Sequence, residues 1–163
     1  HIIQGKEEFR WLVDEVEKIN PHVIIEIGVQ YGGSLKFWEQ LVGSGDLVVG
    51  VDINPEPSWN IKESSRRIVL VAGDSINSET VGKVKEALGG KMADFLYIDG
   101  DHSYVAVSKD FENYFRFVRS GGLVGFHDLY TDAMNPKKVF DSLEGRKEER
   151  HLGGQGTGIW WKW

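Results

Sequence analysis

The chain of 163 residues contains no cysteine, which excludes disulfide bonds, zinc–thiolate sites and thiol nucleophiles. It also lacks an excess of positive charge: its formal net charge of -6 disfavours a nonspecific nucleic-acid-binding protein, which needs a basic face. No stretch approaches the ~18 consecutive apolar residues of a membrane span, and the first residues show no basic-then-apolar leader pattern. We therefore expect a cytoplasmic protein that binds neither nucleic acid nor membrane.

What the sequence does contain is typical of a globular domain. Apolar residues make up 40% and charged residues 27% of the chain, and the length suffices for one substantial core. No repeat, linker or low-complexity tract interrupts it. We predict a single domain over residues 1–163.

Short apolar runs alternate with segments of helical periodicity. The pattern predicts helices over residues 6–19, 34–42, 78–88, 105–118 and 135–143, and strands over residues 23–27, 47–53, 68–72, 95–98 and 123–126. Such alternation implies right-handed βαβ units and a parallel sheet. The charged stretch 145–150, a glycine-rich reversal and the aromatic segment 159–163 predict a closing hairpin. We expect an α/β fold with one doubly wound, mostly parallel seven-stranded sheet and a C-terminal antiparallel hairpin at one edge.

Two of the predicted strands end abruptly in acids and histidines. Asp99 and His102 follow the run that ends at residue 98, and His127 and Asp128 follow the run that ends at residue 126. Ligands bind at the carboxyl ends of strands in open α/β sheets. If both strands deliver these side chains to one crevice, the site could hold a metal ion and move a proton.

A glycine-rich turn, E-I-G-V-Q-Y-G-G-S over residues 26–34, follows the first strand. Glycine lets a ligand approach the backbone closely, and the helix start behind the turn favours a carboxylate or phosphate. The G-x-x-x-G-G spacing differs from the G-x-G-x-x-G of dinucleotide enzymes. The alternative is a tight turn that binds nothing.

Acids close the next two strands. Asp52, at the end of the second, could accept hydrogen bonds from both hydroxyls of a ribose, and Asp74 with Ser75 could meet an adenine amine. With Glu26 they place negative charge around a ligand, which would repel the pyrophosphate of a nicotinamide dinucleotide. S-adenosylmethionine, which carries a sulfonium and an ammonium, suits such a lining. Helix capping by Asp74 is the alternative explanation.

The segments E-I-G-V-Q-Y-G-G-S, V-D-I, A-G-D-S, Y-I-D-G-D-H-S-Y and G-G-L-V-G-F-H-D resemble class I S-adenosylmethionine-dependent methyltransferases. More narrowly, they resemble the small metal-dependent O-methyltransferases grouped with macrolide-sugar and cephalosporin-pathway enzymes, and more distantly catechol O-methyltransferase. The resemblance covers roughly residues 4–130 and implies a Rossmann-like methyltransferase fold.

The resemblance assigns roles to the matching positions. It places Asp99 in the cofactor site, in the metal site and among the catalytic residues. The predicted cofactor-binding residues are Gln4, Glu26, Gly28, Gln30, Ser34, Asp52, Ile53, Asp74, Ser75 and Asp99. The predicted metal ligands are Asp99, His127 and Asp128, and the catalytic residues are His102, as general base, and Asp99. Relatives usually carry Glu or Asp where this chain has His127. A softer imidazole ligand would weaken magnesium binding or favour manganese, and the alternative is that His127 is itself a base.

These residues predict an S-adenosylmethionine-dependent O-methyltransferase that acts on a hydroxyl of a small molecule. A magnesium or manganese ion would lower the pKa of a coordinated hydroxyl, and His102 would take its proton. A vicinal diol, as in a sugar or a catechol, would chelate the ion. The alternatives are a noncatalytic S-adenosylmethionine-binding module, a NAD-dependent dehydrogenase and a metal-dependent hydrolase.

Two loops of the chain could supply the residues that contact the acceptor. Loop 129–135, which includes Leu129, Tyr130, Thr131, Asp132 and Met134, and the loop with Trp59 are candidates. Because the chain leaves little room for a lid, a homo-oligomer whose partner subunit completes the acceptor site is also an alternative.

Overall fold

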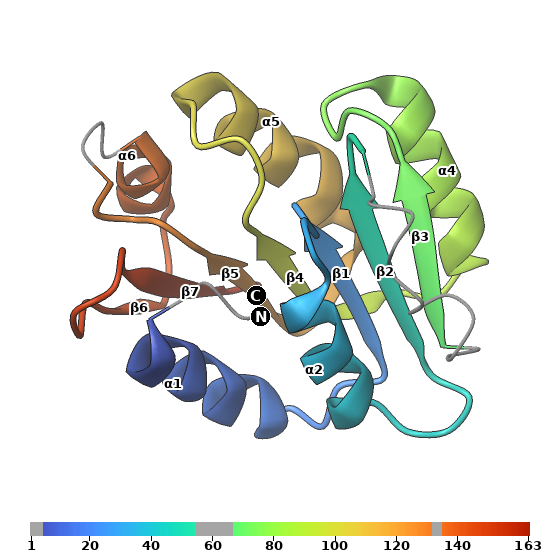
Figure 1. Cartoon of the computed structure of the whole chain (residues 1–163), viewed down its shortest axis with the longest axis horizontal. Coiled ribbons are helices and arrows are strands. Elements are labelled where there is room, and N and C mark those ends of the chain that lie inside the picture. The colour runs from blue at the N-terminus through green and yellow to red at the C-terminus, as the bar shows by residue number, and fades with distance from the viewer. Residues whose placement is uncertain (1–4, 55–66, 132–134) are drawn as a thin grey trace.

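The computed structural model describes residues 5–54, 67–131 and 135–163. Its centre is a seven-stranded sheet with the order β3-β2-β1-β4-β5-β7-β6 (Figure 1). The strands are β1 (Val23–Ile27), β2 (Leu47–Asp52), β3 (Ile68–Ala72), β4 (Ala93–Ile98), β5 (Val118–Phe126), β6 (Lys147–Arg150) and β7 (Thr157–Trp161). The first five strands are parallel, and β7 pairs antiparallel with both β5 and β6. The predicted fold class and closing hairpin are confirmed.

Helices cover both faces of the sheet (Figure 1). They are α1 (Lys6–Glu17), α2 (Gly33–Leu41), α4 (Ser78–Leu88), α5 (Tyr104–Tyr114) and α6 (Asn135–Ser142). One apolar cluster joins α1 and α2 to one face, and a second joins α4, α5 and α6 to the other. The sheet is therefore doubly wound, as predicted. None of the helices in the described ranges has the length and apolarity needed to cross a membrane.

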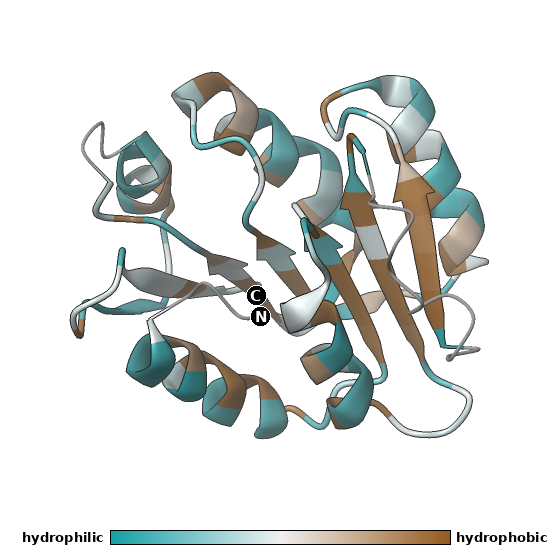
Figure 2. Cartoon of the chain, viewed as in Figure 1, coloured by the Kyte–Doolittle hydropathy of each residue, from teal (hydrophilic) through white to brown (hydrophobic). Residues whose placement is uncertain are grey.

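The strands form where the chain is continuously apolar, and every residue of β1 and β4 is buried. In Figure 2 the hydrophobic colour concentrates on the central strands, whereas the helices show hydrophilic stretches. This pattern is expected for parallel strands that are covered on both faces. It also leaves the strand ends as the natural place for polar side chains.

The predicted boundary between the fifth strand and the preceding helix is wrong. We predicted a helix over residues 105–118, but α5 ends at Tyr114, a 3-10 turn spans Phe115–Phe117, and β5 begins at Val118. Val118 pairs with Ala93, and the register shifts before Phe95 pairs with Leu123. This register shift lets β5 include Gly121 and Gly122, which the sequence pattern had placed outside the strand.

A buried carboxylate connects the start of the fold to its final loop. Glu8, on α1, is fully buried. Its Oε1 accepts hydrogen bonds from the backbone N–H groups of Leu152 (2.5 Å) and Gly154 (3.0 Å), and its Oε2 accepts one from Gly156 (3.1 Å). Three donors satisfy a charge that would otherwise be costly to bury. The β6–β7 loop is thereby held against α1.

Candidate functional site

A cavity of about 720 Å³ opens at the carboxyl ends of the parallel strands. It lies where the strand order reverses, because β1 stands between β2 and β4, and such switch points bind ligands in open α/β sheets. Among the predicted site residues, the cavity is lined by Gly28, Gln30, Ser34, Asp52, Ile53, Asp74, Ser75, Asp99, His102, His127 and Asp128. Glu26 lies behind this lining, and Gln4 lies outside the described residues.

The glycine-rich turn is built against the end of β4. Gly28 has φ +85°, a conformation that L side chains rarely adopt. A Cβ at Gly28 would overlap the carbonyl oxygen of Asp99 and lie 2.5 Å from the carbonyl carbon of that residue. Only glycine therefore lets the turn approach the backbone that carries Asp99.

Asp52 braces the same turn from the neighbouring strand. Its Oδ2 accepts hydrogen bonds from the N–H groups of Val29 (3.0 Å) and Gln30 (2.8 Å), and its Oδ1 accepts one from Asn54 (2.9 Å). Gln30 also has a positive φ, of 44°. Since each carboxylate oxygen can accept two hydrogen bonds, Asp52 keeps acceptor capacity toward the cavity that it lines.

Glu26 is a fully buried acid on β1, beneath the start of α2. The hydroxyl of Ser34 donates a hydrogen bond to its Oε1. Burial raises the pKa of Glu26 to about 8, the Ser34 hydrogen bond opposes this, and the nearby charge of Asp99 adds to it. Glu26 therefore acts on the cavity through Ser34, which lines it.

The raised pKa of Glu26 makes a prediction about stability. Between the ordinary pKa near 4.5 and the raised value near 8, the folded protein holds a proton that the unfolded chain releases, so this contribution to stability declines as pH rises, with a slope of up to about 1.4 kcal/mol per pH unit. We expect Glu26→Gln to remove that contribution. Urea unfolding at pH 6, 7, 8 and 9 should show the variant gaining stability relative to the original protein; parallel pH profiles would contradict it.

The β3–α4 loop forms the other end of the cavity. Asp74, Ser75 and Ile76 all line it. The Oδ1 of Asp74 accepts a hydrogen bond from the N–H of Ile76 (3.1 Å), whereas the N-cap of α4 is Asn77, whose side chain accepts from Glu79. The capping explanation for Asp74 is therefore wrong: Asn77 caps the helix, and the Asp74 carboxylate shapes the loop at the cavity.

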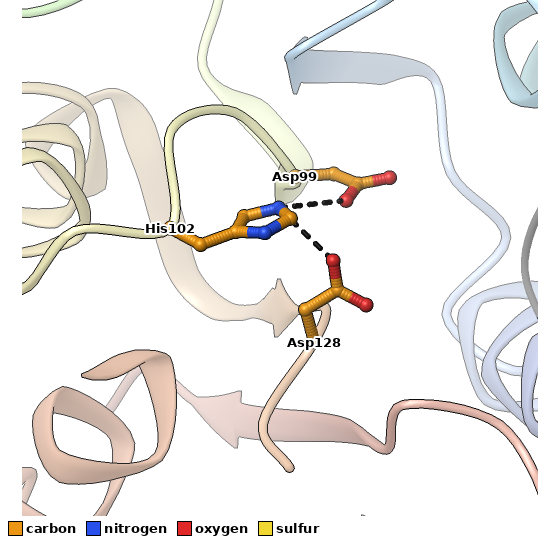
Figure 3. Close-up of side chains that lie close together, drawn as sticks. All are labelled: Asp99, His102 and Asp128. Carbon is orange, nitrogen blue, oxygen red and sulfur yellow. Dashed lines mark ion pairs between the residues drawn. The ribbon is translucent and has the colours of Figure 1, made fainter. Parts of the chain in front are cut away.

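Carboxylates and imidazoles gather at the ends of β4 and β5. Asp99, His102 and Asp128 offer ligand atoms that all lie within 4.8 Å of one another (Figure 3). The Nε2 of His102 lies 3.0 Å from Asp128 Oδ2 and 3.9 Å from Asp99 Oδ1. Asp128 has a φ of +54°, a conformation that non-glycine residues rarely adopt outside functional or turn positions.

His127 is buried beside this cluster and contacts the same two acids. Its Nδ1 is 2.9 Å from both Asp99 Oδ1 and Asp128 Oδ1. Burial alone would lower the pKa of His127, but the two carboxylates outweigh it and raise the pKa to about 10. Burial would likewise raise the pKa of Asp128, yet the neighbouring His127 and His102 hold it below its usual value.

The donor set fits a divalent cation. Two carboxylates supply the hard oxygen ligands that magnesium prefers, and atoms bound at ~2.1 Å lie up to ~4 Å apart across one ion, close to the spacing of this cluster. Carboxylate oxygens also suit manganese, and an imidazole ligand suits other divalent transition metals. His102, which we predicted as a base, belongs to the compact group, and His127 contacts the same carboxylates.

The sequence did not predict several residues of the cavity lining. Gly154 and Gln155 of the β6–β7 loop form one wall, and Tyr31 and Ile76 belong to the lining as well. The only signal for the wall was the glycine-rich stretch 153–158, which we interpreted as a reversal. Nothing in the sequence connected Glu8 to that loop. Of the acceptor candidates, Asp132, Met134 and Trp59 lie outside the described residues.

Comparison with known proteins finds one family over most of these elements. Residues 25–129 match the model of a family described as a methyltransferase domain. The match spans more than half of the chain, from β1 through the residues that follow β5. It contains the glycine-rich turn, Asp52, Asp74 and the carboxylate–histidine cluster.

Individual proteins show the same likeness. Demethylmacrocin O-methyltransferase of Streptomyces fradiae is 32% identical over 137 residues, which are 80% of this chain and 33% of that protein. MycE methyltransferase from the mycinamycin biosynthetic pathway, solved with Mg and SAH, is 25% identical with a TM-score of 0.62, over 76% of this chain and 35% of its own. This chain thus spans about a third of the length of both.

A third protein is similar over nearly the whole described fold. The structure of a putative caffeoyl-CoA O-methyltransferase from Staphylococcus aureus has a TM-score of 0.75 and covers 97% of this chain and 84% of its own, at 18% identity. At that identity the likeness shows the shared fold.

Proposed function

We propose that this chain, which belongs to the methyltransferase domain family, transfers a methyl group from S-adenosylmethionine to a hydroxyl oxygen of a small molecule. The family match agrees with the predicted enzyme class and not with a dehydrogenase or a hydrolase. The observation that carries the proposal is the continuous cavity in which the glycine turn and Asp52 lie beside the Asp99–His102–Asp128 cluster. A cofactor and an acceptor could meet there.

The cofactor would lie along the ends of β1, β2 and β3. Gly28 and Ser34 would contact its methionine end, Asp52 would accept hydrogen bonds from the ribose hydroxyls, and the Asp74–Ile76 loop would meet the adenine. Ile53, which is 75% exposed, would cover one face of the base. The several carboxylates give the cavity a negative potential, which attracts a cationic sulfonium compound. MycE and related O-methyltransferases have been solved with SAH or SAM, which supports this cofactor.

A divalent cation held by Asp99 and Asp128 would lower the pKa of a bound hydroxyl. Around it, the residues of the chain have separate tasks. Asp128 orients His102 through the 3.0 Å contact to Nε2, so that the partly exposed imidazole stands at the mouth of the cavity and can take the proton of the acceptor. His127 balances the charge of the two carboxylates, which its Nδ1 contacts.

The acceptor would approach over the β5 side of the cavity. Gly154 and Gln155 form the wall there, and two adjacent hydroxyls, as in a sugar diol or a catechol, would suit a cation between two carboxylates. MycE has been solved with Mg, SAH and mycinamycin VI, which supports a small-molecule acceptor.

Calorimetric titration tests the proposal. The protein should bind S-adenosylhomocysteine and a divalent cation, and it should convert S-adenosylmethionine to S-adenosylhomocysteine when a diol or catechol panel is added with magnesium or manganese. Binding without turnover across the panel would favour the noncatalytic alternative. If the protein does not bind S-adenosylhomocysteine, the proposal is wrong.

Replacing His127 tests which cation the site holds. We expect His127→Glu to tighten magnesium binding about tenfold, because it removes a competing positive charge and adds a hard oxygen ligand. Titration of magnesium and manganese into both proteins gives the affinities. His22→Glu adds the same charge at the amino end of β1 and should leave them unchanged. Equal magnesium affinity in the His127 variant would show that this side chain is remote from the ion.

A further inference from the structure

A second hollow lies between α4 and α5, two helices that pack on the same face of the sheet. We call it the α4–α5 groove. Its volume of about 500 Å³ falls in the range of small-molecule sites, roughly 300–1,000 Å³. The proposed methyl transfer does not use this groove, so its composition asks for another explanation.

The α4–α5 groove combines apolar side chains with positive charge. Ile76, Val81 and Phe117 supply the apolar surface. Its charged residues are Lys85 and Arg116, and among the described residues no acid lines it. The chain as a whole is acidic, with a formal net charge of -6, and five aspartates line the large cavity at the strand ends. An anion with an apolar body is therefore attracted to the groove and repelled by the cavity.

Arg116 is arranged to bind a carboxylate. Its Nε donates to the carbonyl oxygen of Asn113 (2.7 Å), and its guanidinium carbon lies 5.6 Å from the centre of the Phe117 ring. These contacts orient the guanidinium and use one of its five N–H donors. Neither Arg116 nor Lys85 forms an ion pair with an acid in the part of the chain that the structure describes. The two terminal amino groups of Arg116 therefore remain for a planar carboxylate.

Gly82 lies in the interior of α4 and lines the same groove. Glycine destabilises a helix interior relative to alanine. The surrounding fold does not require it, because a Cβ at Gly82 would meet no atom within 4 Å. A longer side chain at this position would occupy part of the groove, so the glycine keeps space open for an occupant.

The groove adjoins the loop that closes one end of the large cavity. Ile76, which is 41% exposed, lines both hollows. Asn113 lines the groove and donates from Nδ2 to the carbonyl oxygen of Ile76 (3.5 Å). The hydroxyl of Tyr114, the next residue of α5, donates to the carbonyl oxygen of Ser75 (2.9 Å). An occupant that packs on Ile76 would therefore hold the same loop that lines the cavity.

We propose that the α4–α5 groove is an effector site for a small molecule with an apolar body and one carboxylate, and that its occupation tightens binding in the large cavity. The carboxylate lies against Arg116 and Lys85, and the apolar body lies over Gly82. An occupied groove fixes the loop at Ile76 in advance, so that a ligand of the cavity loses less entropy when it orders that loop. Binding in the groove is independent of the proposed function, whereas the coupling rests on it.

The probe is 2-naphthoate, and 2-naphthamide, which keeps the apolar body without the charge, is its control. In amide NMR spectra of the intact chain, 2-naphthoate should shift the signals of Gly82 and Phe117 saturably, and 2-naphthamide should bind about tenfold more weakly. Arg116→Gln should weaken 2-naphthoate about tenfold, the effect of losing a charge-assisted hydrogen bond. Lys83→Gln removes a charge of the same helix that pairs with Glu79 (2.8 Å) and should leave the affinity unchanged. Equal losses in the two variants would overturn the site.

Gly82→Met tests the groove without damaging the fold. Because a Cβ there meets nothing and methionine favours a helix, the free energy of unfolding should not fall. Binding of 2-naphthoate should weaken more than tenfold, because the new side chain fills the space that the apolar body needs. A variant that binds 2-naphthoate as tightly as the original protein would show that the occupant does not lie in the groove.

The coupling is read from the binding of S-adenosylhomocysteine. At saturating 2-naphthoate, its dissociation constant by calorimetry should fall about fivefold, and hydrogen exchange at the amide of Ile76 should slow. Gly82→Met should abolish both effects. If 2-naphthoate competes with S-adenosylhomocysteine, or leaves its affinity unchanged, the effector site is wrong. If the protein binds no S-adenosylhomocysteine, the proposed function fails instead, and the 2-naphthoate titration still decides whether the groove binds.

Discussion

Asp99→Asn is expected to lower the rate of methyl transfer by about a thousandfold. Asp99 is the acid shared by the metal group and by His127, whose Nδ1 lies 2.9 Å from its Oδ1. The neutral amide would bind a cation poorly and would also face His127 with less charge. A bound ion supplies several kcal/mol of transition-state stabilisation, and each ~1.4 kcal/mol corresponds to a factor of ten in rate.

The measurement is formation of S-adenosylhomocysteine with a catechol or diol acceptor at saturating cofactor and cation. Asp101→Asn is the matched control, because it changes a carboxylate two residues away whose Oδ1 accepts from the N–H of Ser103, a hydrogen bond that an amide oxygen can keep. It should cost less than about tenfold, below the effect of a general base. Cation affinity should fall in the Asp99 variant alone. Full activity of Asp99→Asn would remove the cation from the mechanism.

Gly28→Ala is expected to be the most disruptive change to the fold of the site. The new methyl group would overlap the backbone of Asp99 and lie 2.7 Å from the Cα of Gly100. Backbone atoms cannot move aside as a flexible side chain can, so β1 and β4 must separate locally. We expect a loss of about 3–5 kcal/mol in the free energy of unfolding, from overpacking and from the positive φ together, and a loss of S-adenosylhomocysteine binding.

Gly90→Ala isolates the backbone contribution to that loss. Gly90 has φ +86°, nearly that of Gly28, but a Cβ there would meet nothing within 4 Å. Its cost should be limited to the conformational strain, about 1–2 kcal/mol. Urea unfolding of both variants measures the difference. Equal losses would mean that the close approach of the turn to Asp99 does not constrain the site.

The sequence predicted the sheet because its signals are local. Apolar runs, glycines and strand-end acids lie within a few residues of one another, and the parallel topology follows from their alternation. The boundary at Val118 was missed because pairing with Ala93, across the sheet, decided it. Tertiary pairing overrides local periodicity in such cases.

The site was predictable to a similar extent. Asp99, His102, Asp128 and Asp52 follow strands, so their convergence follows from topology alone. The buried acid that holds the β6–β7 loop against α1 was not predictable. The contacts of Glu8 span more than 140 residues. Long-range partners of a buried charge leave no trace in local spacing.

Glu8 has a consequence for the order in which the protein assembles. The parallel strands pair over shorter separations in the chain, the longest being between β1 and β4. The wall at Gly154 and Gln155 forms only when a residue of the first helix meets the last loop. Contacts of such long sequence separation are generally slow to form. A chain whose sheet has already condensed would therefore still lack one side of its binding cavity, and the capacity to hold a ligand would arise only at the end of folding.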